Sequence, residues 1–190
     1  MKNTIIALLC LFGVNCFSQE GVIKPLSASG LDSQNGTYIK DLDTVFANYT
    51  GLWQGNWNGR HIELKIEKIT KKTITFSNGN YYYEDTLIGK YTVTDSNGTV
   101  IANSMGIPIT EHQKLTSIGS GKNNKMGFSY DDSDYCGVSG IVYLKRNLLN
   151  PNELEYHFNY GEFFINSSCP SYPEAPVIPI PTEIITLTKI

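Results

Sequence analysis

The chain has 190 residues, a length that suits one domain with short additions. Charged residues make up 17% and aromatic residues 12%, which disfavours an intrinsically disordered chain, since such chains are rich in charge and poor in aromatic side chains. The formal net charge of −3 also lacks the basic excess with which nucleic-acid-binding proteins neutralise phosphates. We therefore expect a folded domain without a nucleic-acid partner.

Residues 1–18 have the features of a secretory signal peptide. Lys2 provides the positive start, and residues 5–14 form an apolar core that is too short for a bilayer, which needs about 20 residues. Cys16 and Ser18 place small side chains before the expected cleavage point. No later stretch is long and apolar enough to be a transmembrane helix. The sequence thus predicts export to the periplasm or the extracellular space.

The cysteines bear on how the exported protein is processed and stabilised. A lipid anchor on Cys16 is an alternative to free export, although Asn15 is not the small residue that lipoprotein processing prefers. Cleavage after residue 18 leaves Cys136 and Cys169, and an even pair in an oxidising compartment predicts a disulfide bond. Such a bond is worth roughly 3–4 kcal/mol in the chain-entropy model. Two unpaired buried thiols are the alternative.

The first part of the exported chain has no strand pattern. Residues 19–36 contain Ser, Gly, Pro and Asn without periodicity, which predicts an extended leader. An apolar stripe at helical spacing follows, and it predicts a short N-terminal helix. The stripe consists of Tyr38, Leu42, Val45, Phe46 and Tyr49.

From Gly51 onward, apolar and polar residues alternate, which is typical of strands with one buried and one solvated face. Asn-Gly pairs at 58–59, 78–79 and 97–98 predict hairpins, because both central residues of a type I′ turn need positive φ. Lys71-Lys72 predicts a further turn. Strands are expected near 52–57, 60–69, 73–77, 80–84, 87–94, 99–104, 113–119, 125–130, 138–146, 153–161 and 183–190.

This series of hairpins predicts an all-β fold: an antiparallel up-and-down, lipocalin-like barrel of about 8–10 strands, because closure removes exposed edges. A two-sheet sandwich is the alternative. Residues 37–190 form this single domain in the prediction. Within it, residues 170–182 carry proline at every third position, the period of polyproline II, which predicts a stiff crossover to the last strand. A docking ligand for another protein is the alternative for this segment.

Gly51-Leu52-Trp53 resembles the GxW motif of lipocalins and the wider calycin superfamily. The resemblance implies that Trp53 plugs the closed end of a barrel that binds small apolar ligands. Lipocalins also lay an arginine from a late strand over this tryptophan, and Arg146 is the candidate for that role.

Most of the chain between residues 20 and 160 is similar to a family of uncharacterised exported bacterial proteins, a domain of unknown function. The resemblance implies export and a lipocalin-like barrel, and it implies no activity. It rests on residues 35–43, 49–55, 80–85, 89–91, 95–98 and 136–140.

Motifs that carry chemistry are scarce. His61, His112 and His157 have no zinc-site spacing, and no nucleotide-binding or nucleophile motif occurs. The acidic run at residues 131–134 offers weak calcium candidates, with an Asp-rich turn as the alternative. These candidates are Asp131, Asp132 and Asp134. We therefore predict no cofactor.

The function that these features favour is a non-enzymatic exported barrel that binds a small apolar or amphipathic ligand. The ligand-lining candidates are aromatic side chains on the predicted strands, namely Tyr83, Tyr156, Phe158 and Tyr160. A structural or interaction protein of the bacterial cell envelope is the first alternative, and an exported hydrolase is the second.

Overall fold

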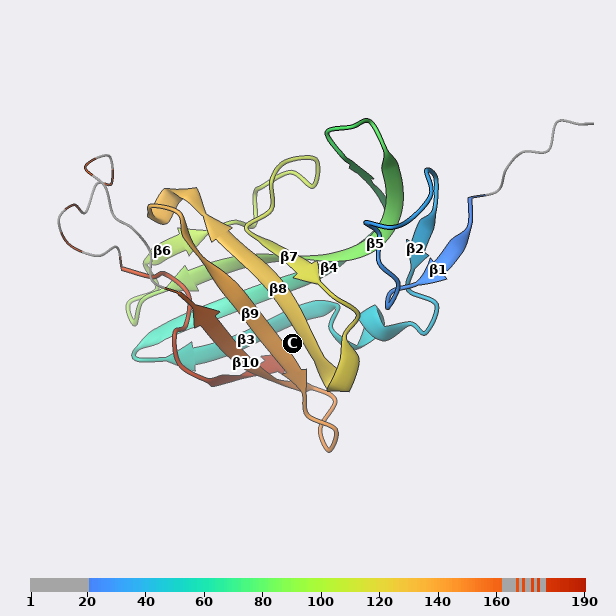
Figure 1. Ribbon diagram of the computed structural model, residues 1–190. Helices are drawn as coiled ribbons and strands as arrows, with labels where there is room; N and C mark the ends of the chain where they lie inside the picture. Colours follow the sequence, from blue (N-terminus) through green and yellow to red (C-terminus); the bar gives the residue numbers. More distant parts are fainter. Residues whose placement is uncertain (1–20, 162–166, 168, 170–171, 173, 175–176) are drawn as a thin grey trace, which may run out of the picture.

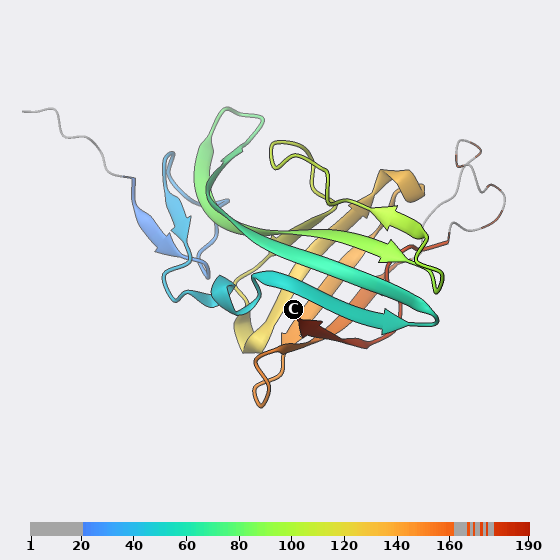
Figure 2. The same ribbon diagram turned by 180° about the vertical axis from the view of Figure 1, so that it is seen from behind.

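The computed structural model of the protein describes residues 21–161, 167, 169, 172, 174 and 177–190. Eight strands close into an antiparallel barrel (Figures 1 and 2), so the predicted all-β barrel is confirmed and the sandwich is not formed. The predicted signal peptide and part of the proline-rich crossover lie outside the described residues. The barrel strands are β3 (Gly51–Trp57), β4 (Arg60–Thr75), β5 (Tyr81–Thr94), β7 (Leu115–Ile118), β8 (Lys125–Asp132), β9 (Val138–Arg146), β10 (Glu153–Tyr160) and β11 (Ile185–Lys189).

The barrel consists of two parts joined by two narrow seams. Its strand order is β5-β4-β3-β11-β10-β9-β8-β7, and β7 pairs with β5 to complete the ring. The β3–β11 pairing and the β5–β7 pairing each comprise two residue pairs, whereas β4 and β5 pair along almost their full length. The seams therefore separate a three-stranded half, β3 to β5, from a five-stranded half, β7 to β11.

Three short strands lie outside the ring, along one edge of β5. β2 (Tyr38–Lys40) pairs in parallel with the start of β5, and β1 (Ile23–Pro25) pairs in parallel with β2. β6 (Val100–Asn103) pairs with the other end of β5. β1, β2 and the outer ends of β4 and β5 form a small projecting sheet, at the right of Figure 1, which we call the arm.

The three predicted Asn-Gly turns are present at the β3–β4, β4–β5 and β5–β6 connections. Asn58 and Gly59 have φ of 44° and 74°, the left-handed conformation that a two-residue hairpin turn requires. These turns fix the register of the first half of the barrel because each sets which residues face one another.

The turn predicted at Lys71-Lys72 is wrong, and the two strands expected on either side of it are one strand, β4. The pairing with β5 shifts register between Ile69 and Lys72, which marks a β-bulge. Lys71 has a φ of 56°, and its backbone N–H bonds a side chain on β5 instead of a ladder carbonyl. The bulge therefore bends β4 and β5 away from the barrel into the arm without reversing the chain.

The short helix expected from residue 38 to residue 49 is replaced by β2 and a single 3-10 turn, η1 (Val45–Asn48). Thr44 has a φ of 53°, which interrupts any continuous helix. The Asp41 carboxylate accepts hydrogen bonds from the backbone N–H groups of Val45 and Phe46, at 2.8 and 3.2 Å, and so holds the short turn. Of the apolar stripe, Val45, Phe46 and Tyr49 pack against the barrel core, whereas Leu42 is exposed.

One end of the barrel is closed by η1 and the predicted tryptophan. Phe46, Tyr49 and Trp53 are buried, and the indole N–H of Trp53 donates to the Tyr49 carbonyl at 2.8 Å. The cation over the Trp53 ring is Lys189 on the neighbouring strand, at 5.2 Å from the ring centroid, rather than the expected Arg146. Burial raises the pKa of Tyr49 to about 12, and the guanidinium of Arg146 opposes that rise.

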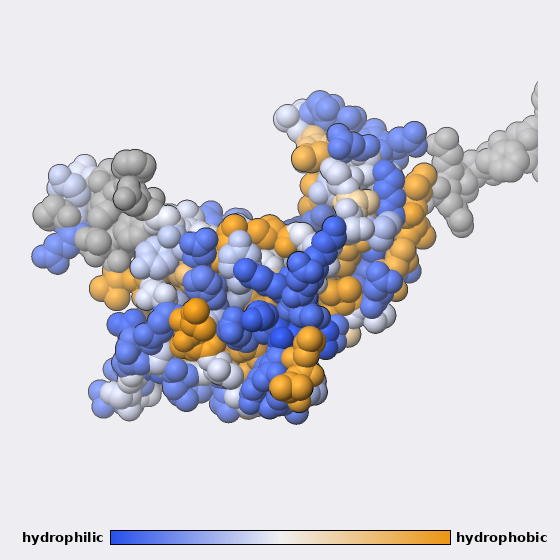
Figure 3. Space-filling view, turned by 60° about the horizontal axis from the view of Figure 1, so that its bottom comes forward, coloured by the Kyte–Doolittle hydropathy of each residue, from blue (hydrophilic) through white to orange (hydrophobic). Residues whose placement is uncertain are grey.

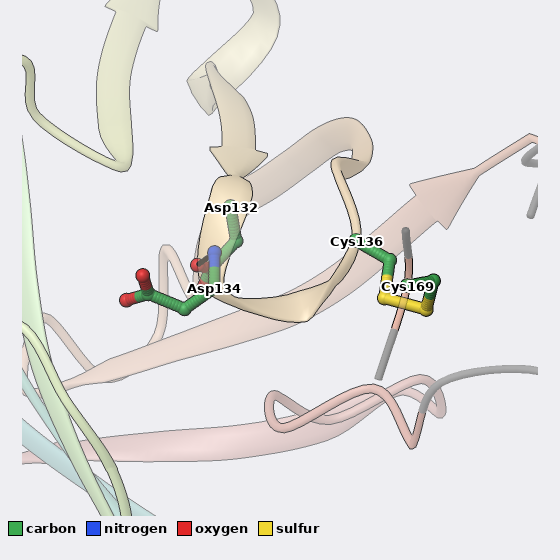
Figure 4. The surroundings of a disulfide bond; sticks show 4 residues. All are labelled: Asp132, Asp134, Cys136 and Cys169. Carbon is green, nitrogen blue, oxygen red and sulfur yellow. Dashed lines mark hydrogen bonds between the residues drawn. A yellow bond between two sulfur atoms is a disulfide. The ribbon is translucent and has the colours of Figure 1, made fainter. Parts of the chain in front are cut away.

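The opposite end is covered by the chain that leads into β11. Ile180 is buried and Ile178 packs against the core. The predicted disulfide between Cys136 and Cys169 is present, with the Cα atoms 5.5 Å apart (Figure 4). It ties this chain segment to the turn between β8 and β9, next to Asp132 and Asp134.

Candidate functional site

The predicted ligand-lining residues fall into different parts of the molecule. Tyr156 and Phe158 point into the barrel and are buried. Tyr160 continues the same strand face but is 41% exposed, and its ring stacks on Phe158 with 5.2 Å between centroids. Tyr83 lies in the arm, on the outer end of β5. The structure therefore brings three of the four together and places the fourth at a separate site.

The barrel interior is occupied by large side chains from every strand of the ring. Trp53, Tyr91, Phe128 and Tyr156 are each no more than 1% exposed. The Tyr156 hydroxyl has no hydrogen-bond partner among the described residues, and burial raises the pKa of Tyr156 well above its usual value. This interior resembles the filled core of a small barrel more than a ligand cavity.

A buried carboxylate forms the polar part of this core. The hydroxyls of Tyr91 and Tyr130 donate to Asp132 Oδ2 at 2.8 and 2.9 Å, and Lys114 Nζ lies 2.6 Å from Asp132 Oδ1. Burial, together with the neighbouring Tyr91 and the Asp132 carboxylate, raises the pKa of Tyr130. Burial alone would lower the pKa of Lys114, but its bonds to Asp132 and Asp134 raise it.

This arrangement bears on the calcium candidates. Lys114 Nζ also lies 2.6 Å from Asp134 Oδ2, so the ammonium sits between two carboxylates, where a cation would bind. Asp131 is exposed, and His112 Nε2 lies 3.7 Å from its Oδ2. Among the described residues, no group of three or more His, Cys, Asp or Glu side chains is arranged to hold a metal ion.

A hollow with a volume of about 670 Å³ lies outside the barrel, in the arm. We call it the tyrosine groove. Tyr38 on β2 and Tyr83 on β5 are register partners, and Ile23 on β1 is the partner of Tyr38, so these side chains share one face of the arm sheet. Tyr81 stands two residues from Tyr83, with 5.7 Å between the ring centroids. The groove is lined by Gly21, Val22, Ile23, Gln34, Asn35, Gly36, Thr37, Tyr38, Lys71, Tyr81 and Tyr83.

Two lysines place positive charge over these rings. Lys71 Nζ lies 4.9 Å from the Tyr83 centroid and 5.9 Å from that of Tyr38, and Lys40 Nζ lies 6.0 Å from the Tyr38 centroid. These distances allow cation–π attraction. Within the described part of the chain, neither lysine has a carboxylate within ion-pair distance.

The buried Asp85 carboxylate holds two of the groove residues, Tyr38 and Lys71, in place. Its Oδ1 accepts the hydroxyl of Tyr38 and the backbone N–H of Lys71, the latter at 3.1 Å. Its Oδ2 accepts the backbone N–H of Asp41 at 3.1 Å and lies 3.1 Å from Lys68 Nζ. Burial favours the neutral acid, but these donors outweigh it and lower the pKa of Asp85. Burial, and then the bond to Asp85, raises the pKa of Tyr38 to about 12.

Lys68 links this carboxylate to a second one. Its Nζ lies 3.2 Å from Asp41 Oδ2, and Asp41 also caps η1. Burial acts to lower the pKa of Lys68, yet the two carboxylates raise it. Both carboxylates are buried and saturated with donors, so this pair suits a structural role better than the acid–base chemistry of a hydrolase.

The comparisons with known proteins assign the chain to a family and leave its activity open. The sequence model of a family of unknown function (DUF6705) matches residues 1–190. The chain belongs to this family. No curated protein and no solved structure matches this member of DUF6705. Among its described residues, no helix is long and apolar enough to cross a membrane. The function of the protein must therefore be inferred from the residues of the candidate site itself.

Part of the groove could be recognised from the sequence. The Tyr81-Tyr82-Tyr83 run was visible, and strand alternation put Tyr81 and Tyr83 on one face. Tyr38 and Lys71 were missed, because one was assigned to a helix and the other to a turn. No local pattern at either residue indicates pairing with β5 or contact with Asp85.

Proposed function

We propose that this DUF6705 member is an exported, non-enzymatic binding protein that holds a small amphipathic ligand in the tyrosine groove. The observation that carries the proposal is the convergence of three tyrosines and Lys71 on one hollow of about 670 Å³, with Lys40 beside the Tyr38 ring. That volume is within the range of small-molecule sites, about 300–1,000 Å³. Tyrosine supplies a flat apolar ring and a polar hydroxyl, so it contacts both parts of an amphipathic ligand.

The groove is a better place for the ligand than the barrel interior. A ligand in the interior has to displace side chains such as Trp53, Tyr91 and Phe128, which form the core of the protein. Large core side chains each contribute about 3–5 kcal/mol to stability when compared with alanine, so displacing them is costly. The groove side chains are already accessible: Tyr81 is 37% exposed.

Export is part of the proposal, and the disulfide supports it. A bond between Cys136 and Cys169 persists in oxidising compartments and is rare in the reducing cytosol. Fractionation of the native cells, followed by N-terminal sequencing, tests this part. A mature chain that begins at Gln19 supports free export, an acylated Cys16 supports the anchored form, and an uncleaved chain in the cytosol refutes export.

Native mass spectrometry of protein purified from its own cells tests the binding function. We expect a small molecule retained by the wild type and lost from a Tyr81→Ala/Tyr83→Ala variant. Tyr143→Ala is the matched control, because Tyr143 also carries a lysine over its ring, with Lys125 Nζ at 3.6 Å, but lies on β9 outside the groove. A molecule that the groove variant retains as well as the wild type does would contradict the groove as the site.

A role as an interaction protein of the cell envelope is the second candidate, and exposed apolar residues favour it. Leu148 and Leu149 are 68% and 97% exposed in the turn between β9 and β10, and Leu148 and Ile184 line one hollow of about 480 Å³. On the face that Figure 3 draws, hydrophobic residues form small separate groups amid hydrophilic ones. Cross-linking in cells tests this role: it predicts a defined larger species that a Leu148→Ser/Leu149→Ser variant does not form.

A further inference from the structure

The charge of the tyrosine groove differs from that of the whole protein. The full chain has a formal net charge of −3, yet the lining residues of the groove include Lys71 and no acidic side chain. Lys40 adds a second positive charge nearby, with its Nζ 6.0 Å from the centroid of the Tyr38 ring. Asp85 is the nearest carboxylate that contacts groove residues, and Lys68 and three hydrogen-bond donors already satisfy it. The groove thus presents positive charge suited to an anionic ligand.

The shape of the aromatic surface narrows the choice of ligand. Tyr38 and Tyr83 lie side by side across two strands, and the ring of Tyr81 stands at 74° to that of Tyr83. Such a surface can contact the ring of a ligand on one face and along one edge. A pyranose ring has apolar C–H faces and hydroxyls around its whole edge, and it can use both the aromatic faces and the surrounding polar groups. Gln34, the Asn35 side-chain NH2 and the hydroxyls of Tyr81 and Tyr83 are the polar groups that the groove offers to that edge. The Tyr38 hydroxyl is already bonded to Asp85, and Asn35 Oδ1 accepts the backbone N–H of Tyr81.

A nucleotide is the main competitor, because bases also stack on aromatic side chains and phosphates also pair with lysine. A base, however, has only a few polar atoms on its edge and is best held between parallel aromatic faces. The perpendicular Tyr81 and Tyr83 rings and the polar rim fit a hydroxyl-rich ring better.

From these observations we infer that the groove binds an acidic saccharide, with a sugar ring against Tyr81 and Tyr83 and its carboxylate paired with Lys71. This inference rests on the proposed binding function and specifies its ligand. Lys71 is exposed and, among the described residues, contacts only ring faces with its ammonium, so it is free to pair with an incoming carboxylate.

Isothermal titration calorimetry on the mature chain tests the inference with two matched probes: a linear trimer of hexuronic acid and its methyl ester. We expect the acid to bind at least about tenfold more tightly than the ester at low salt, because a bond to a charged group is stronger than a neutral one. Added salt should remove most of this difference. Lys71→Gln should reduce the affinity for the acid to that for the ester, and Tyr83→Ala should abolish binding of both. Lys125→Gln is the matched control and should bind as the wild type does.

The outcomes separate this inference from the proposed function. If the acid and the ester bind equally and Tyr83→Ala abolishes both, the acidic specificity is wrong and the groove remains a binding site. If neither trimer binds but a nucleoside monophosphate does, the saccharide assignment is overturned. If no probe binds and native protein retains no molecule, both the inference and the proposed function fail. The salt dependence of the wild type keeps the test valid if a variant does not fold.

Discussion

Asp85 joins the groove to the barrel, and replacing it with asparagine should therefore affect both stability and binding. The carboxylate accepts from Tyr38, Lys71 and Asp41 and pairs with Lys68. Asparagine keeps the shape but replaces one accepting oxygen with an NH2 donor. Two of the four donors then face another donor, whichever way the amide is oriented.

The size of the expected loss of stability follows from these contacts. Each buried polar group left without a partner costs about 1–3 kcal/mol. Lys68 is 32% exposed at its side chain and retains Asp41, so its share is small. We expect Asp85→Asn to lower the free energy of unfolding by about 2–4 kcal/mol at pH 7. For a domain of this size, that corresponds to a fall in Tm of roughly 5–15 °C.

The pH dependence gives a second measure of the same effect. Because the folded-state pKa of Asp85 is lowered, its ionised form contributes stability that is fully present well above the ordinary value of 3.8. That contribution is lost as the pH falls through the lower folded-state pKa. Urea denaturation should therefore show a difference in the free energy of unfolding between wild type and variant that is constant near neutral pH. This difference should narrow below about pH 4. A difference under about 0.5 kcal/mol at pH 7, or one that does not narrow in acid, would refute this account; Asp131→Asn, at an exposed carboxylate, is the control.

Three further substitutions test other parts of the fold by urea denaturation. Replacing Cys136 and Cys169 with serine should cost roughly 3–4 kcal/mol, since the bond closes a loop over a sequence separation of 33; a stability equal to that of the wild type would contradict this. Lys114→Met should cost about 3–5 kcal/mol because it leaves Asp132 buried without its cation, and the loss should be much smaller if Asp132 is also replaced by Asn. Trp53→Ala should cost about 3–5 kcal/mol, and an unchanged midpoint would mean that this end of the barrel is not packed as described.

The barrel could be predicted from the sequence because the patterns that specify its strands and turns involve residues close together in the chain. Strand alternation and Asn-Gly turns act over two to ten residues, and strands such as 138–146 and 153–160 follow that pattern closely. The disulfide followed from counting cysteines after the expected export. None of these inferences needs knowledge of which distant strands are neighbours.

The groove could not be predicted in the same way, because its residues are positioned by long-range contacts. Tyr38 looks helical by its spacing, and only the parallel pairing with Tyr83 makes it part of a strand. Lys71 looks like a turn residue, and its bulge is held by Asp85, which is 14 residues further along. The cation over Trp53 is likewise Lys189 because β11 pairs with β3, a contact between the two ends of the domain.

The two narrow seams have a consequence for the movements and the assembly of the barrel. Each seam consists of two residue pairs, whereas neighbouring strands within each half are joined by at least four. We expect amide hydrogen exchange to be fastest at these seams and slowest in the centre of the β4–β5 ladder. A molecule with a seam open exposes unpaired strand edges, and such edges can pair with the matching half of a second copy. Concentrated protein held under mildly destabilising conditions should therefore accumulate exchanged dimers before it unfolds completely.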